Sequence, residues 1–182
     1  MAVNTTVCDF GREAPNFSLP STDGSKVTLD SAKGPNGVLI MFICNHCPYV
    51  VSAIERIVAD AKVLQDSGIG VAAICANDAR SHPEDSFENM KNFSREHNFC
   101  FPYMHDETQS VARDYGAECT PDFFGFNSAL ELQYRGRLDS AGSGRPDGAT
   151  IRELRNAMLA IAESGKGPEN QVPSMGCSIK WK

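Results

Sequence analysis

The sequence predicts an α/β fold with a central mixed sheet flanked by helices. Two apolar runs, Val38–Ile43 and Gly70–Cys75, contain no charged residue, which is typical of strands that are covered on both faces. An amphipathic helical pattern follows each run, and this alternation of strands and helices indicates the α/β class. The 182 residues are enough to bury a substantial core. We therefore expect a single domain over residues 1–182, in which residues 166–182 form a C-terminal tail.

Apolar periodicity predicts the elements of the first half of the chain. Within residues 11–30, apolar side chains alternate on either side of a turn at Asp23-Gly24, which predicts a short N-terminal hairpin. Residues 48–65 carry apolar side chains at spacings of three and four, so they should form an amphipathic helix with Pro48 in its first turn. A further helix is expected from Pro83 to near Asn98.

The next stretch predicts a short helix, a hairpin and a loop. Asp106 and Gln109 resemble a capping pattern for a short helix that ends at Gly116. Two β-rich segments then predict an antiparallel hairpin, and a Gly- and Ser-rich segment after them predicts a mobile loop. The hairpin strands are residues 123–126 and 130–134, and the loop is residues 139–148.

The last predicted helix has both a start and a stop signal. Thr150 and Glu153 have the spacing of a capping box, and Gly165 is placed to end the helix. The apolar residues between these signals recur with a helical period, so they should face the core. They are Ile151, Leu154, Met158 and Ile161.

The segment Cys44-Asn45-His46-Cys47-Pro48 predicts a reactive dithiol. It joins a buried strand to the helix that begins near Pro48, so Cys44 is expected at or just before a helix N-terminus. Backbone N–H groups and the helix dipole favour a thiolate there, so the pKa of Cys44 should lie below the ~8.5 of a free thiol. His46 can add positive charge near this sulfur, and a stabilised thiolate makes the corresponding disulfide comparatively oxidising.

Other interpretations of this segment stay open. Cysteines at this spacing form half of many zinc sites, although no second pair and no His-x₃₋₅-His motif completes one. They also occur as small buried residues, but the corner between a strand and a helix is an edge position rather than a core position. His46 is either a residue that adjusts the thiolate or an ordinary surface histidine.

Composition argues against several classes of function. The net charge is −6 and the Lys and Arg residues are scattered, which does not suit a nucleic-acid surface. No segment has the length of a membrane span and the start of the chain lacks signal-peptide features, so we expect a cytoplasmic protein. Seven cysteines are an odd number, and a reducing compartment keeps most of them as thiols, which favours catalytic pairing over structural disulfides. No cofactor is expected.

Three segments together resemble the redoxin branch of the thioredoxin-like superfamily. They are Gly11–Gly24, the strand that leads into Cys44-x-x-Cys47, and Thr120-Pro121-Asp122 before the predicted hairpin. The similarity covers nearly the whole chain. It is close to the alkyl hydroperoxide reductase and thiol-specific antioxidant relatives that carry a Cys-Asn-His-Cys-Pro-Tyr motif. The resemblance implies a thioredoxin-like fold with an N-terminal hairpin before the central sheet.

The resemblance also implies a substrate-binding position beside the dithiol. Pro121 would be a cis proline that faces the two sulfurs, although an ordinary trans proline at the start of an edge strand is the alternative. The cis form would leave the Thr120 backbone exposed to pair with an extended substrate by strand addition.

Two further cysteines are possible redox thiols. Cys119 lies two residues before Pro121 and could be a third redox thiol, a metal ligand or a packed residue. Cys177 in the tail could resolve an oxidised cysteine, as a C-terminal cysteine does in some peroxiredoxins. Alternatively, Ile179 and Trp181 pin the tail to an apolar groove and Cys177 is incidental. No function is assigned to the other three cysteines, which are Cys8, Cys75 and Cys100.

The chain departs from the peroxiredoxin motif Pro-x-x-x-Thr-x-x-Cys, whose Thr hydroxyl and loop backbone hold the peroxide. With Cys47 as the peroxidatic residue, Cys44 and Ile40 occupy the Thr and Pro positions. With Cys44 in that role, the positions hold Met41 and Gly37. Neither register fits, so the groups that accelerate peroxide reduction are missing. The chain also has Ile43 where thioredoxins usually have a Trp before the dithiol.

We therefore expect a thiol–disulfide oxidoreductase that serves cell redox homeostasis. Cys44 would attack a substrate disulfide and Cys47 would resolve the mixed disulfide. The expected partners are a disulfide-containing protein or small-molecule thiol and a cellular thiol reductant, with no nucleic acid or membrane. Two alternatives are a peroxiredoxin-like hydroperoxide reductase that uses the same cysteines, and a non-catalytic module. Such a module would sense redox state or hold a metal through Cys44, Cys47 and either Cys119 or Cys177.

Overall fold

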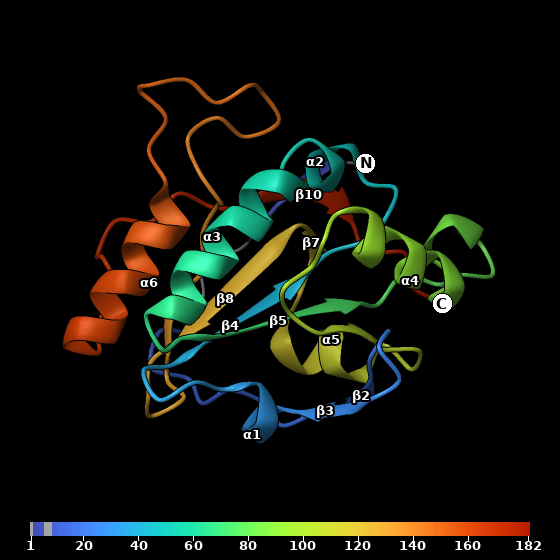
Figure 1. The fold of residues 1–182 in the computed structure, drawn as a ribbon, viewed down its shortest axis with the longest axis horizontal. Helices are drawn as coiled ribbons and strands as arrows, with labels where there is room; N and C mark the ends of the chain where they lie inside the picture. Colours follow the sequence, from blue (N-terminus) through green and yellow to red (C-terminus); the bar gives the residue numbers. More distant parts are fainter. Residues whose placement is uncertain (1, 6–8) are drawn as a thin grey trace.

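The computed structural model describes residues 2–5 and 9–182 and has a five-stranded sheet at its centre (Figure 1). The central strand β4 pairs in parallel with β5 and antiparallel with β8, and β6 and β9 form the two edges. The mixed α/β sheet expected from the sequence is therefore confirmed. The strands are β4 (Val38–Phe42), β5 (Gly70–Cys75), β6 (Tyr103–His105), β8 (Asp122–Phe126) and β9 (Leu132–Tyr134).

Strand β4 lies at the centre of the core because both of its faces are buried. Leu39 and Met41 pack into one apolar cluster, and Ile40 and Phe42 pack into another on the opposite face. Helices cover the two faces of the sheet, as Figure 1 shows. One face carries α3 (Ile54–Asp66), α4 (Phe87–Glu96) and α6 (Glu153–Ser164), and the other carries α1 (Leu29–Ala32) and α5 (Ser110–Tyr115).

The N-terminal hairpin is present as expected. Strands β2 (Ser18–Pro20) and β3 (Lys26–Thr28) pair antiparallel around the turn that contains Asp23. The Asp23 carboxylate accepts hydrogen bonds from the Ser25 N–H and hydroxyl groups, which fixes this turn. The hairpin leads directly into α1, and Leu19 and Val27 pack against the same face of the sheet as that helix.

A second, smaller sheet contains part of the segment that the sequence indicated as a tail. Strand β10 (Met175–Ser178) lies between β1 (Ala2–Asn4) and β7 (Cys119–Thr120), and both pairings are antiparallel. The C-terminal segment therefore folds back onto residues that flank the dithiol. In Figure 1 this strand lies next to helix α2 (Pro48–Val51).

The helix predicted over residues 48–65 is broken into α2 and α3, so that prediction was partly wrong. The break falls at Ser52 and Ala53, between the two helices. The Arg56 side chain donates to the Ser52 carbonyl at 3.0 Å. A side chain that enters the backbone ladder in this way commonly bends or interrupts a helix. Pro48 occupies the first helical position, as expected.

The capping box predicted for the last helix is also wrong. Helix α6 begins at Glu153 after Arg152, which makes no side-chain cap bond. The Glu153 carboxylate instead pairs with Arg137, and the Thr150 hydroxyl bonds to Asp147. Ile151 is 57% exposed rather than part of the apolar face. The other predicted members of that face, Leu154, Met158 and Ile161, are buried as expected.

Helix α5 ends at Gly116 as predicted but is capped differently at its start. Gln109 lies in the left-handed region at the N-cap and makes no side-chain cap bond. The Asp106 carboxylate accepts instead from the Ala112 N–H at 2.8 Å. The Gln109 amide is therefore free to bond elsewhere, and it donates to the Lys180 carbonyl in the C-terminal segment.

A buried ion pair holds the Gly- and Ser-rich loop at residues 139–148. The loop has no regular helix or strand, but Arg56 Nε lies 2.7 Å from Asp139 Oδ2, and the Asp139 side chain is fully buried. Arg56 also donates to the Gly142 carbonyl at 2.6 Å. This end of the predicted mobile loop is thus fixed to helix α3.

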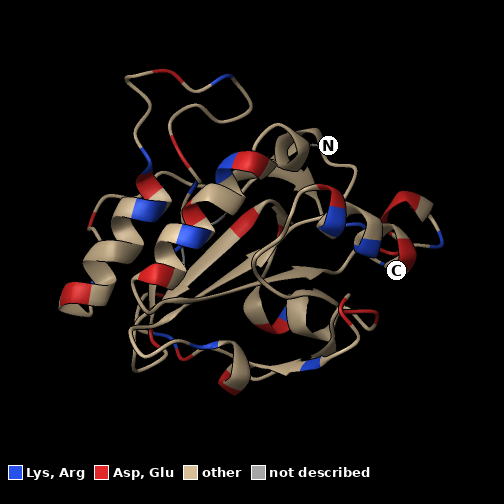
Figure 2. Ribbon diagram, in the orientation of Figure 1, with Lys and Arg blue, Asp and Glu red and all other residues tan. Residues whose placement is uncertain are grey.

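Among residues 2–5 and 9–182, no helix has the length and apolar character of a membrane span. Figure 2 shows both acidic and basic positions along α3 and α6. This distribution agrees with the scattered Lys and Arg residues of the sequence.

Replacing Arg56 should test how much the loop depends on its buried ion pair. Arg56→Met should lower the free energy of unfolding by ~3–5 kcal/mol, because the buried Asp139 carboxylate loses its cationic partner. Lys33→Met breaks the exposed Lys33–Asp30 pair and should leave stability nearly unchanged. Urea unfolding measures both variants, and equal losses would contradict the account. Adding Asp139→Asn to Arg56→Met should restore part of the stability.

Candidate redox site

The two cysteines of the motif lie together where β4 meets helix α2. Cys47 is the N-cap of α2, and Cys44 follows Ile43 after the end of the strand. Cys44 and Cys47 are 1% and 0% exposed, and both sulfurs contact Thr120. The structure therefore brings the predicted dithiol together, but it places Cys47 rather than Cys44 at the helix N-terminus.

The reduced pair favours a thiolate on Cys47. The pKa of Cys47 is lowered, first because of its interaction with the neighbouring Cys44 thiol. Cys177 and the Val50 N–H lower this pKa further, while burial opposes them. The pKa of Cys44 is raised by its interaction with Cys47, by burial and by the Asp85 charge. The sequence-based expectation of a lowered pKa for Cys44 is therefore wrong, because the helix N-terminus acts on the other sulfur.

Thr120 and Pro121 lie against both sulfurs. The Thr120–Pro121 peptide bond is cis, as the resemblance implied. The Thr120 hydroxyl lies 3.3 Å from Cys44 Sγ, and the Thr120 carbonyl oxygen lies 3.1 Å from Cys47 Sγ. When Cys47 is protonated, its thiol donates a hydrogen bond to this carbonyl. Thr120 thus contacts the reacting atoms themselves.

The chain's own strand β10 occupies the backbone edge that the resemblance assigned to a substrate. Cys177 lies directly opposite Thr120 in the β7–β10 register. The strands approach closely because residue 176 is glycine, and a Cβ there would lie 2.1 Å from the Thr120 carbonyl oxygen. A substrate cannot pair with this edge while β10 is in place.

His46 is held by Asp85, a buried carboxylate that the sequence did not single out. His46 Nδ1 lies 2.7 Å from Asp85 Oδ2, and the imidazole stacks on His82 with 5.3 Å between ring centroids. Asp85 is fully buried and accepts from the Asn45 N–H at 2.8 Å and from the Asn77 amide at 2.7 Å. Asp85 therefore positions the Cys-Asn-His-Cys turn.

Asn45 fixes the other side of this turn. Its amide donates to the Glu84 carbonyl at 2.9 Å, and its Oδ1 accepts from the Tyr103 hydroxyl at 3.0 Å. The turn at residues 83–85 is a short 3₁₀ helix, whereas the sequence predicted the start of a longer helix there. This turn delivers Asp85 and Glu84 to the dithiol.

One group of side chains in the described part of the chain has the ligand types and spacing to hold a metal ion. Ligand atoms of Cys44, His46 and Asp85 all lie within 4.8 Å of one another. Zinc binds thiolate, imidazole and carboxylate ligands, and three protein ligands leave a fourth position open. This set shares only Cys44 with the metal ligands considered from the sequence.

The remaining described cysteines differ in their surroundings. Cys119 is buried, its thiol donates to the Pro121 carbonyl at 3.4 Å, and burial raises its pKa. Burial also raises the pKa of Cys75, to about 12. Cys100 is half-buried beside helix α3, where its thiol lies 3.9 Å from the Val58 carbonyl. Cys8 lies outside the described residues.

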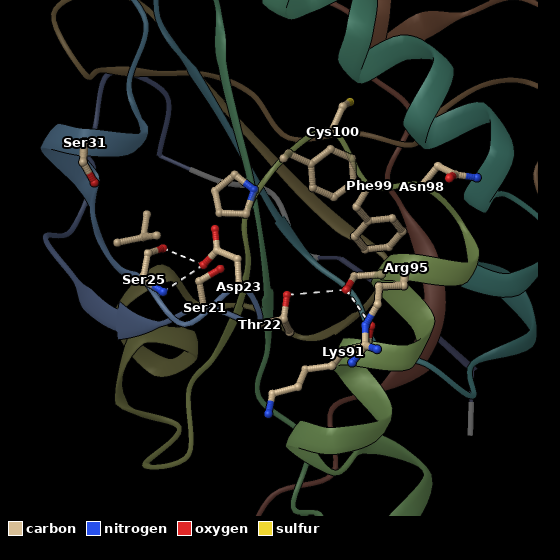
Figure 3. A pocket seen from close by; sticks show the side chains of 14 residues that line it. Ser21, Thr22, Asp23, Ser25, Ser31, Lys91, Arg95, Asn98, Phe99 and Cys100 are labelled. Carbon is tan, nitrogen blue, oxygen red and sulfur yellow. Dashed lines mark hydrogen bonds between the residues drawn. The ribbon is translucent and has the colours of Figure 1, made fainter.

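A cavity of about 490 Å³ lies beside the redox site. Its walls include Pro121, Tyr49 from α2 and Met175 from β10, so it lies next to the cis proline and the dithiol turn. A larger cavity of about 830 Å³ is lined by neither Cys44 nor Cys47 and lies between the N-terminal hairpin and α4. Figure 3 shows Lys91 and Arg95 of α4 lining this second cavity.

Residues 10–138, which include the dithiol and cis Pro121, match the sequence model of the AhpC/TSA family. The chain belongs to this family. Its structure is similar to that of an uncharacterized conserved protein from Geobacillus kaustophilus, with a TM-score of 0.94 and 43% identity over 100% of this chain and 97% of that one. A thiol:disulfide interchange protein of the thioredoxin family from Chlorobium tepidum TLS is 21% identical, with a TM-score of 0.58 over 71% of this chain and 87% of that one. The AhpC/TSA chain thus has a thioredoxin-like fold.

Curated relatives of the AhpC/TSA chain include both thiol–disulfide oxidoreductases and peroxiredoxins. Thiol-disulfide oxidoreductase ResA from Bacillus thuringiensis is 26% identical over 118 residues, which are 63% of this chain and 62% of ResA. Chloroplastic peroxiredoxin Q from Oryza sativa is 27% identical over 125 residues, which are 67% of this chain and 53% of that relative. The matches therefore span only part of these relatives, and they place the chain among thiol-based redox proteins.

The pH dependence of thiolate absorbance should show which sulfur carries the charge. Because the pKa of Cys47 is lowered, a thiolate signal should persist at neutral pH and be lost only when the pH falls below the usual range of a thiol. Cys44→Ala should raise this pKa, because it removes the neighbouring thiol that contributes most to the shift. Ultraviolet absorbance of the reduced protein measures the titration, with Cys47→Ser as the blank. A signal that survives in Cys47→Ser would refute the assignment.

Proposed function

We propose that this chain is a thiol–disulfide oxidoreductase whose redox pair is Cys44 and Cys47. The observation that carries this proposal is the position of the two sulfurs at the start of α2, where Cys44 Sγ lies 3.3 Å from the Thr120 hydroxyl and Cys47 Sγ lies 3.1 Å from the Thr120 carbonyl oxygen. Thiol–disulfide exchange needs one thiolate to attack and a second thiol close enough to resolve the mixed disulfide. Membership of the AhpC/TSA family and the similarity to ResA support this chemistry.

The electrostatics favour Cys47 as the attacking sulfur, which reverses the order expected from the sequence. Its lowered pKa provides a thiolate at neutral pH, whereas the Cys44 thiol retains its proton. The Cys47 thiolate attacks one sulfur of a substrate disulfide, and the other substrate sulfur leaves with the proton of Cys44. The Cys44 thiolate then attacks Cys47, which releases the reduced substrate and forms the Cys44–Cys47 disulfide.

His46 and Asp85 act as positioning residues in this scheme, and Thr120 contacts the reacting sulfurs. The 2.7 Å contact between His46 and Asp85 and the bond from the Asn45 N–H hold the turn that carries both cysteines. The Thr120 hydroxyl lies 3.3 Å from Cys44 Sγ. It can accept a hydrogen bond from the Cys44 thiol and donate one to the Cys44 thiolate. The cavity beside Pro121 offers a route for the substrate sulfur.

Peroxide reduction is the second candidate function, because peroxiredoxin Q is among the relatives and a low Cys47 pKa also suits attack on a peroxide. The motif comparison weighs against it. With Cys47 as the peroxidatic residue, Cys44 and Ile40 occupy the positions of the Thr and Pro that peroxiredoxins use.

Stopped-flow oxidation of the reduced, metal-free protein by hydrogen peroxide separates the two candidates. We expect a rate near that of a free thiol, and a much faster rate would favour the peroxidase.

Trapping experiments should identify the attacking sulfur. In a Cys177→Ser background, Cys44→Ser keeps the Cys47 thiolate but removes the resolving thiol, so a mixed disulfide with a small-molecule disulfide substrate should accumulate on Cys47. Cys47→Ser in the same background should form none. Non-reducing peptide mapping reads out both variants. Accumulation only in Cys47→Ser would instead assign the attack to Cys44, and normal turnover in both would exclude the dithiol mechanism.

A further inference from the structure

Cys177 contacts the redox pair from strand β10. The antiparallel register places it opposite Thr120, the residue whose hydroxyl and carbonyl face the two sulfurs. Cys177 packs against the apolar cluster that contains Cys44 and Cys47, and its proximity helps to lower the pKa of Cys47. Cys47 therefore has two neighbouring thiols, Cys44 on its own turn and Cys177 from the far end of the chain.

The C-terminal segment is anchored on the far side of Cys177. The Gln109 amide donates to the Lys180 carbonyl at 2.9 Å and accepts from the Lys182 N–H at 2.9 Å. The Asn77 side chain accepts from the Lys180 N–H at 2.9 Å, and Ile179 is buried among apolar residues. These bonds fix the position of Cys177, so its contact with Cys47 belongs to the folded chain rather than to a loose tail.

Cys177 is also the most accessible of the three thiols. Cys44 and Cys47 are 1% and 0% exposed, whereas Cys177 is half-buried. A thiol from another molecule can therefore reach Cys177 with less rearrangement than either member of the pair. Cys119, which lies two residues before Pro121, differs from Cys177 because it is fully buried and donates to the Pro121 carbonyl.

We propose that Cys177 is a third redox thiol that transfers the disulfide from the buried Cys44–Cys47 pair to an external thiol reductant. This inference rests on the proposed function, because it starts from the Cys44–Cys47 disulfide. Strand β10 holds Cys177 at the edge where a substrate strand would pair, so the chain supplies an internal thiol substrate for its own dithiol.

The exchange keeps the number of electrons and disulfides constant. The Cys177 thiol loses its proton and its sulfur attacks Cys47 Sγ, so the Cys47–Cys177 bond forms and the Cys44–Cys47 bond breaks. The electron pair of the broken bond stays on Cys44 Sγ, which takes up the proton that Cys177 lost. A small-molecule thiol then attacks Cys177 Sγ, and the Cys47 thiolate leaves. A second molecule of the same thiol resolves the mixed disulfide on Cys177, so two external thiols are oxidised to one disulfide and the protein returns to its reduced state.

The Cys44→Ser variant tests the contact between Cys47 and Cys177 directly. Oxidation of this full-length variant with diamide, followed by thiol blocking and non-reducing peptide mapping, should yield a Cys47–Cys177 disulfide. The disulfide should be lost in Cys44→Ser/Cys177→Ser and retained in Cys44→Ser/Cys100→Ser, where the substituted cysteine is also half-buried but contacts helix α3. Failure of Cys44→Ser to form this disulfide would overturn the proposal.

A kinetic measurement on proteins that keep the Cys44–Cys47 pair covers the case in which Cys44→Ser folds poorly. Oxidised Cys177→Ser should be reduced by glutathione more slowly than the oxidised wild type, while Cys100→Ser should match the wild type. Equal rates in all three proteins would overturn the role of Cys177 but leave the proposed function intact. Absence of a Cys44–Cys47 disulfide in the oxidised Cys177→Ser protein would instead overturn the proposed function.

Discussion

The placement of the Cys44 and Cys47 sulfurs side by side against Thr120 determines the chemistry available at this site. Burial alone would keep both sulfurs protonated, because a charge in a protein interior loses its hydration. The interaction between the two sulfurs favours a negative charge on one while the other keeps its proton. The Val50 N–H at the start of α2 lowers the pKa of Cys47 further. The charge therefore resides on Cys47 because of where α2 begins, and the position of that start is set by Pro48.

The residues around Cys44 and Cys47 hold the two sulfurs in position and keep solvent away from them. Strand β4 is buried on both faces and ends just before Cys44, so the motif leaves the sheet at a fixed place. Asp85 then holds the turn, and Thr120 and β10 close over the sulfurs from the other side. A site this enclosed suits a small substrate that enters beside Pro121, or an internal thiol already in place on β10.

Local patterns in the sequence predicted the sheet and both hairpins, because apolar alternation reports directly on which faces are buried. The same patterns did not reveal the role of Asp85. Its partner Asn45 lies forty residues away, and the acidic residues around Asp85 indicate only the start of a helix. They also failed at Glu153, because a long-range pairing with Arg137 replaced the local cap. The pairing of β10 with β7 has no local signal either, although the cysteine in β10 stood out as an unusual residue for a tail.

Equilibration of the wild-type protein across a series of glutathione redox buffers tests the central claim most directly. Thiol blocking and peptide mapping at each point would show which cysteines are linked. The account predicts one two-electron transition whose oxidised product contains Cys47 joined to Cys44 or to Cys177. A transition whose product leaves Cys47 as a free thiol, with any other pair of cysteines joined, would contradict it.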